Sequence, residues 1–542
     1  MPIILVEYAI GRFTQNSAPV AFMKFYGKRF CWVGGWLSTT VLFLSGYYPV
    51  VVGWCLYYLF ISVTFGSLPG DEEAGMAVFN DFVRDSYWPV FTQFLAIFLS
   101  GIFLFGGIRW IEKANMVLVP LLLAIVIFTF GWSLTRDYAE VGITFLFTPT
   151  WRVMKKYVGR KRVLLKLYLN LQIPEESFAI PGLWIAAAGQ NAFDTGAGMS
   201  VLMTYAAFTG RSASITKYSI FIPLVNNLLL EVWKYRLRRP KLVANEKLLC
   251  LDHDFLYGVL YAHYDESNCH KIRYPENYAE NRSWQHRANI YLCRLMPNVF
   301  IMSRNYSAIR IPVLFSKVGI LGRILCALFF LCLTFAGVSS LLSAIQAYVF
   351  TIKEMGVPHR IAVSVALVLT FLIGLPSALS LEFLDNQDNT WGYALIISGL
   401  IMASVSIIYG PIRFRRVLVN EYGTNDWNVP IIWIPIITFV VPIIGIALII
   451  WWIYDYVRMN SYWYHLTLES VTSTLLEWLI VIILLLGTNM IVYYCRREFY
   501  TKPRNVGCDP YKPSTYEDPR KFKLEDVKVT TNGISDANSA EH

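Results

Sequence analysis

The sequence predicts an all-α polytopic membrane protein, and three observations support this. Of the 542 residues, 56% are hydrophobic and only 15% are charged, which is outside the range of soluble globular domains. Apolar stretches long enough to cross a bilayer recur along the chain. Charged residues gather in the loops between them. The 47 Lys and Arg residues therefore form no single basic face, and we expect no nucleic-acid partner.

The apolar stretches predict the helices in order. They cover 31–64, 89–107, 116–134, 183–208, 215–232, 324–350, 361–380, 391–410, 430–453 and 473–494. An incomplete apolar helix over 1–11 precedes them, so we expect about eleven helices. The cysteines are scattered without a CxxC pair, which supports neither a zinc site nor a redox motif.

The charges of successive loops alternate in sign. The loops around Lys24 and Lys353 are basic, whereas those around Asp71 and Glu382 are acidic. The positive-inside rule places the basic loops in the cytoplasm, together with the tail 496–542. That tail is rich in polar residues and is predicted to be disordered.

Two segments break this pattern. The stretch 152–180 is basic although it falls on the predicted outer side, and 233–311 opens with a basic cluster and continues as a long polar region. One explanation is a lineage-specific insertion, and the other is an imperfect gene model in which non-coding sequence is translated. We favour the second, because the charge rule holds elsewhere along the chain.

The stretch WIAAAGQNAFDTGAGMSVLMTY, residues 184–205, has polar and small residues in its middle. Gln190 and Asp194 interrupt the apolar run, and Gly196 and Gly198 weaken the helix directly after them. Open backbone inside a membrane is tolerated only where protein or a cavity surrounds it. The pattern predicts a broken helix with a binding site at the break; the alternative is a pair of packing glycines in an ordinary helix.

Several motifs in a fixed order indicate a family. They are PIILVEYAIGR, SGYYPVVVGW, GIRWIEKANMVLVPLL, FLFTPTW, PGLWIAAAGQNAFDTGAGMSVLMTYAAF, FFLCLTFAGVSSLLSAIQ and LEFLDNQDNTWGYA. With these motifs the chain resembles the neurotransmitter:sodium symporters, transporters of the LeuT fold. The resemblance implies an inverted-repeat fold from which the first helix and part of the second and seventh are lacking.

The resemblance also implies how the chain is divided. The segments are helices 2 (partial) to 5 over 1–151, an atypical basic insertion over 152–180, a broken sixth and partial seventh helix over 181–232, an atypical polar insertion over 233–311, helices 8 to 12 over 312–495, and the tail 496–542.

The resemblance implies two sodium sites. Ala336, Ser339 and Ser340 match one of them, as a carbonyl and two hydroxyls, which are ligands that suit a hard cation. The alternative is that the serines bond back to their own helix. At the other site, Asp194 stands at a family Thr or Ser position and Asn226 at its asparagine, although Asn227 competes for that role and interhelical bonding is an alternative for both.

Asp194 further predicts that chloride is not required. Chloride-dependent members hold an anion beside this sodium site, and similar chloride-independent members place a seventh-helix glutamate there, where this chain has Leu230. Asp194 would itself supply the fixed negative charge. The alternative is that Asp194 is protonated or faces water.

The substrate contacts carried over by position are Tyr48, Phe193, Gly196, Met199 and Ala344. Tyr48 would donate to a substrate carboxylate, Phe193 would cover the site, and the other three would shape an apolar pocket. Because residues 196 and 344 are small, the pocket favours a medium or large neutral amino acid. Without the resemblance, core packing or a membrane-interface position would explain the aromatic residues.

Three polar residues are assigned gating or structural roles by the resemblance. Glu7 is the glutamate of the second helix, Gln190 belongs to the broken helix, and Asp388 matches an acid of the extracellular gate. For Asp388 the alternative is a solvated loop acid.

Taken together, the resemblance implies a sodium-coupled symporter of a neutral amino acid or related amine, working by alternating access and catalysing no reaction. We expect it in the plasma membrane, with its C-terminus in the cytoplasm, with sodium ions and a small-molecule substrate as ligands, the lipid bilayer around it and a homo-oligomer as one assembly. The alternative is a non-transporting fragment or regulatory membrane protein derived from this family.

Overall fold

The computed structural model describes residues 1–64, 68–134, 181–225, 309, 311–313, 315–316, 319–459, 463–468, 470–495 and 507–512. Within these ranges the regular structure is helical and contains no strand. The prediction of an all-α polytopic membrane protein is confirmed, because eight of the described helices are long and apolar enough to cross a bilayer. The predicted insertions lie outside the described residues, except for Ile309 and Ile311, which are buried in the main core.

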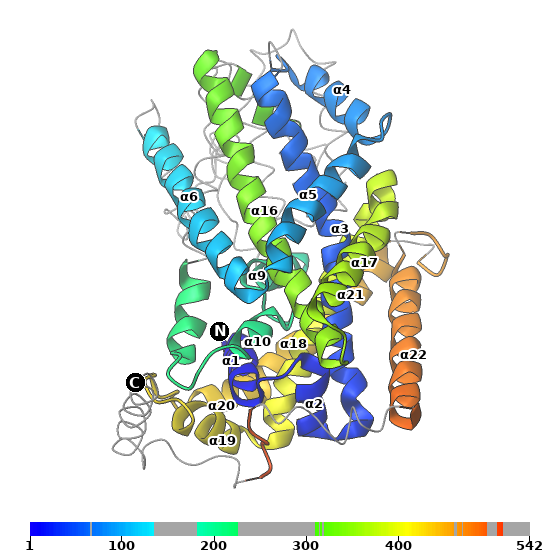
Figure 1. Cartoon of the computed structure of the whole chain (residues 1–542). Coiled ribbons are helices and arrows are strands. Elements are labelled where there is room, and N and C mark those ends of the chain that lie inside the picture. The colour runs from blue at the N-terminus through cyan, green and yellow to red at the C-terminus, as the bar shows by residue number, and fades with distance from the viewer. Residues whose placement is uncertain are drawn as a thin grey trace, which may run out of the picture.

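The first two helices lie in the lower half of the molecule, and the third runs from there to the upper end (Figure 1). α1 spans Pro2–Thr14, and its 13 residues make a helix of about 20 Å. α2 (Ala18–Tyr26) follows, and α3 (Cys31–Thr64) then crosses the whole molecule. α3 packs against α2 and against most of the long helices that follow in the chain, which makes it the central element.

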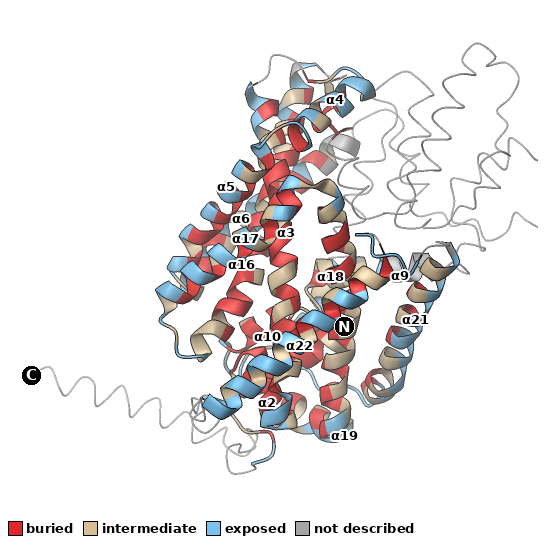
Figure 2. Ribbon diagram, turned by 90° about the vertical axis from the view of Figure 1, so that its right-hand side faces the viewer, coloured by how far each residue is buried: buried red, intermediate tan, exposed pale blue. Residues whose placement is uncertain are grey.

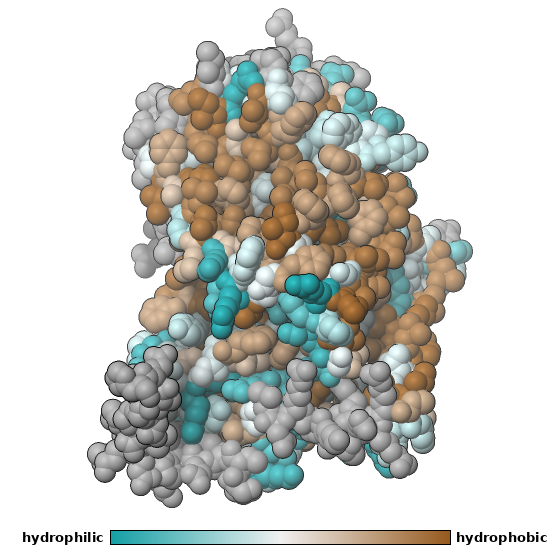
Figure 3. Space-filling model, in the orientation of Figure 1, coloured by the Kyte–Doolittle hydropathy of each residue, from teal (hydrophilic) through white to brown (hydrophobic). Residues whose placement is uncertain are grey.

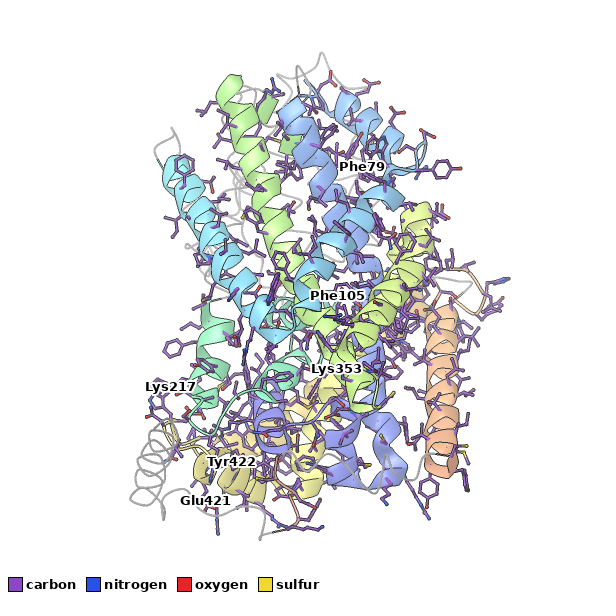
Figure 4. The ribbon with its side chains drawn as sticks, viewed as in Figure 1. Phe79, Phe105, Lys217, Lys353, Glu421 and Tyr422 are labelled. Atoms are coloured by element: carbon purple, nitrogen blue, oxygen red, sulfur yellow. The ribbon has the colours of Figure 1, made fainter. Side chains whose placement is uncertain are left out.

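The next helices begin at the opposite end. α4 (Glu72–Val83) starts at an N-cap, where the side chain of Asp71 accepts the N–H of Ala74 at 2.8 Å. α5 (Trp88–Phe105) and α6 (Ile108–Leu134) complete the first half. Phe79 of α4 lies at the upper end, whereas Lys217 and Tyr422 lie near the lower end (Figure 4).

The second half begins with α9 (Pro181–Thr195) and the short α10 (Val201–Ala206), and an apolar helix over Ile215–Val225 follows. The long helices α16 (Ile320–Glu354), α17 (His359–Leu379) and α18 (Leu381–Tyr409) come next. The chain then passes through α19 (Pro411–Phe414), α20 (Trp433–Pro435), α21 (Val441–Met459) and α22 (Val471–Cys495).

Several predicted boundaries differ from the observed helices, and two of them involve polar or irregular turns. α18 begins ten residues before the predicted stretch 391–410, because the polar segment ahead of it is helical and is capped by the Ser380 side chain, which accepts the N–H of Phe383 at 3.3 Å. The predicted helix 430–453 is α21 preceded by short α-helical and π-helical turns. Apolar length alone therefore located the spans but not the polar turns attached to them.

Burial follows the membrane prediction. Buried residues concentrate on α3, α16 and α18 in the middle of the bundle, and exposed ones lie on its outside (Figure 2). The exposed surface of the face in Figure 3 is largely hydrophobic over the upper part, as expected where lipid replaces water. α21 and α22 carry many of the exposed Ile and Leu side chains.

Part of the predicted disordered tail is ordered. Residues 507–512 lie against the lower end of the bundle, where the N–H of Cys508 donates to the carbonyl of Phe13 at 2.9 Å. The hydroxyl of Tyr409 donates to the carbonyl of Pro510 at 2.8 Å. The prediction of disorder over the whole of 496–542 is therefore wrong for these six residues, because hydrogen-bond partners far away in the sequence hold them.

Candidate functional site

The helix predicted to break over residues 184–205 is interrupted at Gly196 and Gly198. α9 ends at Thr195 and α10 begins at Val201. Between them Gly196 has φ +70°, Gly198 has φ +84° and Ser200 has φ 56°, all in the left-handed region. Glycine adopts this region at no steric cost, so two glycines permit a change of direction that other residues would resist. The predicted break is confirmed.

Glu7 on α1 is bound to this break. Its side chain is fully buried, and its carboxylate accepts a hydrogen bond from the backbone N–H of Gly198. The broken helix leaves several N–H groups without a helical partner, and a carboxylate is a strong acceptor for one of them. Glu7 therefore provides an acceptor for the open backbone at Gly198.

α1 and α10 approach each other closely one turn further on. A Cβ on Gly11 would lie 2.1 Å from the carbonyl oxygen of Met203 and 2.9 Å from the Cβ of Ala206. Only glycine fits this position. Glu7 and Gly11 are four residues apart and so share one face of α1, which faces the break and the start of α10.

α18 supports the break on another side. A Cβ on Gly198 would lie 3.1 Å from the carbonyl oxygen of Leu395. The ring of Phe193 packs near Gly392, whose missing Cβ would stand 3.5 Å from Phe193 Cε2. Phe193, the predicted cover residue, therefore lies against α18 at Gly392, and the break contacts α18 one turn further on.

The predicted substrate residues lie on α3, α9, α16 and the break between α9 and α10. Tyr48 of α3, Ala344 of α16 and Met199 of the break all pack against one hydrophobic cluster of the core. Phe193 and Met199 pack against the neighbouring main cluster. Gly196 faces open space, with no atom within 4 Å of where its Cβ would be. Four of the five predicted residues thus adjoin the core clusters around the break.

The three residues of the first predicted sodium site are on α16. The hydroxyl of Ser339 donates to the carbonyl of Ala336 at 2.9 Å, which is the back-bonding foreseen as the alternative. Its oxygen lone pairs are still available to accept or to bind a cation. Ser340 is exposed, and Ala336 is partly buried.

The second predicted sodium site is only partly described. Asp194 lies at the end of α9, partly buried, one residue before the end of the helix. Asn226 lies outside the described residues, and of Gln190 only the backbone position in α9 is described. Asp388 is 4% exposed within α18, so the alternative of a solvated loop acid is wrong.

Two contacts near the site were not foreseen. The hydroxyl of Tyr205 on α10 forms a hydrogen bond with Ser343 Oγ on α16 at 2.8 Å. Trp36 Nε1 on α3 donates to Ser398 Oγ on α18 at 3.2 Å. Both join elements more than a hundred residues apart, and no sequence signal pairs them. The Glu7 and Gly11 pair did carry a signal, because a carboxylate and a glycine share a face within an apolar helix.

The described helices and the broken-helix site belong to an all-α polytopic membrane protein. No family model matches the chain. The chain is similar to a protein named as an uncharacterized sodium-dependent transporter of Methanocaldococcus jannaschii, with 27% identity over 42% of this chain and 42% of that protein. It is also similar to an uncharacterized sodium-dependent transporter of Bacillus subtilis, with 25% identity over 42% of this chain and 45% of that protein. The chain therefore spans less than half the length of these relatives.

Proposed function

We propose that this chain is a sodium-coupled symporter of the neurotransmitter:sodium symporter family, carrying a neutral amino acid or related amine by alternating access. The observation that carries the proposal is the break between α9 and α10, which Glu7 supports between α1, α18 and the core. Broken helices meeting inside a bundle are a recurring device for binding substrate and ions. The two relatives are named as sodium-dependent transporters, which supports the sodium-coupled part of the proposal.

Bound sodium would raise the affinity for substrate, and bound substrate would raise the affinity for sodium. Ser339, Ser340 and Ala336 would offer oxygens to the ion. Tyr48, Met199 and Ala344 pack against one apolar cluster and would line the substrate pocket. If both sites use the α9–α10 break, occupation of one stabilises the geometry that the other needs, and the coupling is reciprocal. We place the protein in the plasma membrane with the lower end of Figure 1 in the cytoplasm, because the loops around Lys24 and Lys353 are basic.

The test is uptake by cells expressing the chain. A panel of radiolabelled amino acids and amines is offered in sodium medium and in choline medium. We expect sodium-dependent accumulation of at least one neutral amino acid. Surface protein without sodium-dependent uptake of any compound would instead favour the non-transporting alternative.

The sodium site makes a quantitative prediction. Alanine at Ser339 or Ser340 removes one candidate oxygen, so we expect the sodium concentration for half-maximal uptake to rise about tenfold, equivalent to about 1.4 kcal/mol. The matched control is Ser364→Ala, because this exposed serine of α17 bonds only to the carbonyl of Arg360 in its own helix, at 3.1 Å. An unchanged sodium dependence in both site variants contradicts the assignment.

Asp194 predicts that uptake does not depend on chloride. Its carboxylate would supply the negative charge beside the ion, so replacing chloride by gluconate should leave the initial uptake rate unchanged. Asp194→Asn removes that charge and should lower uptake, and added chloride should then restore part of it. A steep chloride requirement in the unaltered chain would defeat the hypothesis.

A further inference from the structure

The peripheral helix α22 carries a carboxylate that binds the start of α18. Glu477 Oε1 accepts the side-chain N–H of Asn386 at 2.7 Å, and Glu477 Oε2 accepts that of Gln387 at 3.1 Å. Glu477 is the only charged residue of α22, and the helix is largely exposed. Because a carboxylate in a membrane helix is costly, one with a donor on each oxygen indicates a specific role.

The hydrogen bonds continue from Glu477 into the core. Gln387 uses its amide N–H on Glu477 and its Oε1 to accept the indole N–H of Trp391 at 3.0 Å. Trp391 is 1% exposed and stacks on Phe43 of α3, with ring centroids 4.2 Å apart and planes 4° apart. Both ends of the Gln387 amide are therefore used, which fixes its orientation.

α22 holds the same turn of α18 at a second point. The indole N–H of Trp478 donates to the carbonyl of Thr390 at 3.3 Å. Thr474 and Thr390 join their hydroxyls at 3.1 Å. Residues 474, 477 and 478 lie on one face of the helix. Four hydrogen bonds thus join this face of α22 to the turn 386–391 of α18. The following turn of α18 contacts the break.

The turn that α22 holds leads directly to the candidate site. Gly392 follows Trp391, and its lack of a side chain leaves room for the ring of Phe193. One turn later, the carbonyl of Leu395 lies against Gly198 of the break. A displacement of Trp391 would move both contacts, because they are on the same rigid helix.

We propose that Glu477 is a positioning residue: through Gln387 and Trp391 it fixes the part of α18 that stands behind Phe193 and the α9–α10 break. The effect on transport rests on the proposed function, whereas the effect on the position of α18 does not. α22 is therefore part of the support of the site, which it reaches through α18.

An exchange of the two partners tests this. Glu477→Gln places an amide N–H opposite that of Gln387, and Gln387→Glu places a second carboxylate opposite Glu477. The double variant Glu477→Gln/Gln387→Glu exchanges donor and acceptor and preserves the bonds to Asn386 and Trp391. The matched control is Glu382→Gln, an exposed acid in the first turn of α18.

Two measurements are made on the full chain in cells. The first is the labelling rate of Asn389→Cys by a membrane-impermeant maleimide, corrected for the chain without that cysteine. The second is the KM of sodium-dependent uptake. Each single exchange should change the labelling rate and the KM by about tenfold. The double variant should return both values to within about twofold of the parent, because it restores the hydrogen bonds that link residue 477 through residue 387 to Trp391.

The outcomes separate the proposals. Single variants that match the parent, or a double variant no better than the singles, overturn the role of Glu477. If the single variants fail to reach the surface, recovery of surface protein by the double variant supports the role and failure to recover opposes it. If the parent shows no uptake, the proposed function fails while the labelling rates still decide the position of α18.

Discussion

Glu7→Ala is expected to lower sodium-dependent uptake by about ten- to a hundredfold at equal surface expression. The variant leaves the N–H of Gly198 without its carboxylate acceptor in a fully buried position. Leaving a buried donor without its partner costs about 1–3 kcal/mol, and each 1.4 kcal/mol changes the fraction of the competent conformation about tenfold. The measurement is initial uptake rate normalised to biotinylated surface protein.

Two variants control this result. Glu7→Gln keeps an oxygen acceptor of nearly the same shape, so it should lose less activity than Glu7→Ala. Glu73→Ala removes an exposed acid of α4 far from the break and should leave uptake unchanged. Full uptake in Glu7→Ala at normal surface expression would show that Gly198 does not need this acceptor.

The sequence contained most of the information on the spans and on the break. Apolar length located the long helices because the bilayer sets the number of residues that a span requires. Gly196 and Gly198 located the break because they stand after a carboxylate in the middle of an apolar run, and both adopt the positive φ that favours glycine. Span length and the break both depend on residues that are close together in the sequence, so they can be predicted from a single segment.

The hydrogen bonds that connect the site to the surrounding helices could not be predicted from local sequence. Glu7 and Gly198 are 191 residues apart, and the partners Tyr205 and Ser343 are 138 apart. Such pairs depend on how helices pack, which no local pattern specifies. The tail shows the same limit, because composition predicts disorder around Cys508, but its N–H bonds to Phe13 at the other end of the chain.

The assignment of ions depends on the resemblance more than on the contacts. Ser339 donates to Ala336 in the manner of many membrane serines, so this hydrogen bond alone does not distinguish a ligand from an ordinary helix residue. Asp388 differs, because the structure does decide between its two interpretations. The sequence around it is also compatible with a loop, but Asp388 is a buried residue of the helix α18.

Gly11→Ala is expected to destabilise the protein by at least about 1–3 kcal/mol, the usual range for overpacking a core. The new Cβ would lie 2.1 Å from the carbonyl oxygen of Met203, and because that atom belongs to the backbone, no side-chain rotation relieves the contact. α1 and α10 would have to separate, which also weakens the hydrogen bond from Gly198 to Glu7. Thermal unfolding in detergent should shift to lower temperature, and sodium-dependent uptake should fall with it.

Gly487→Ala is the matched control for this prediction. Gly487 lies in α22 with no atom within 4 Å of its Cβ position, so alanine fits without displacement. Alanine is favoured over glycine in a helix by about 1 kcal/mol, and the unfolding temperature should stay the same or rise. Equal losses in both variants would indicate a general intolerance of substitution, whereas a loss confined to Gly11 locates the sensitivity at the contact between α1 and the broken helix.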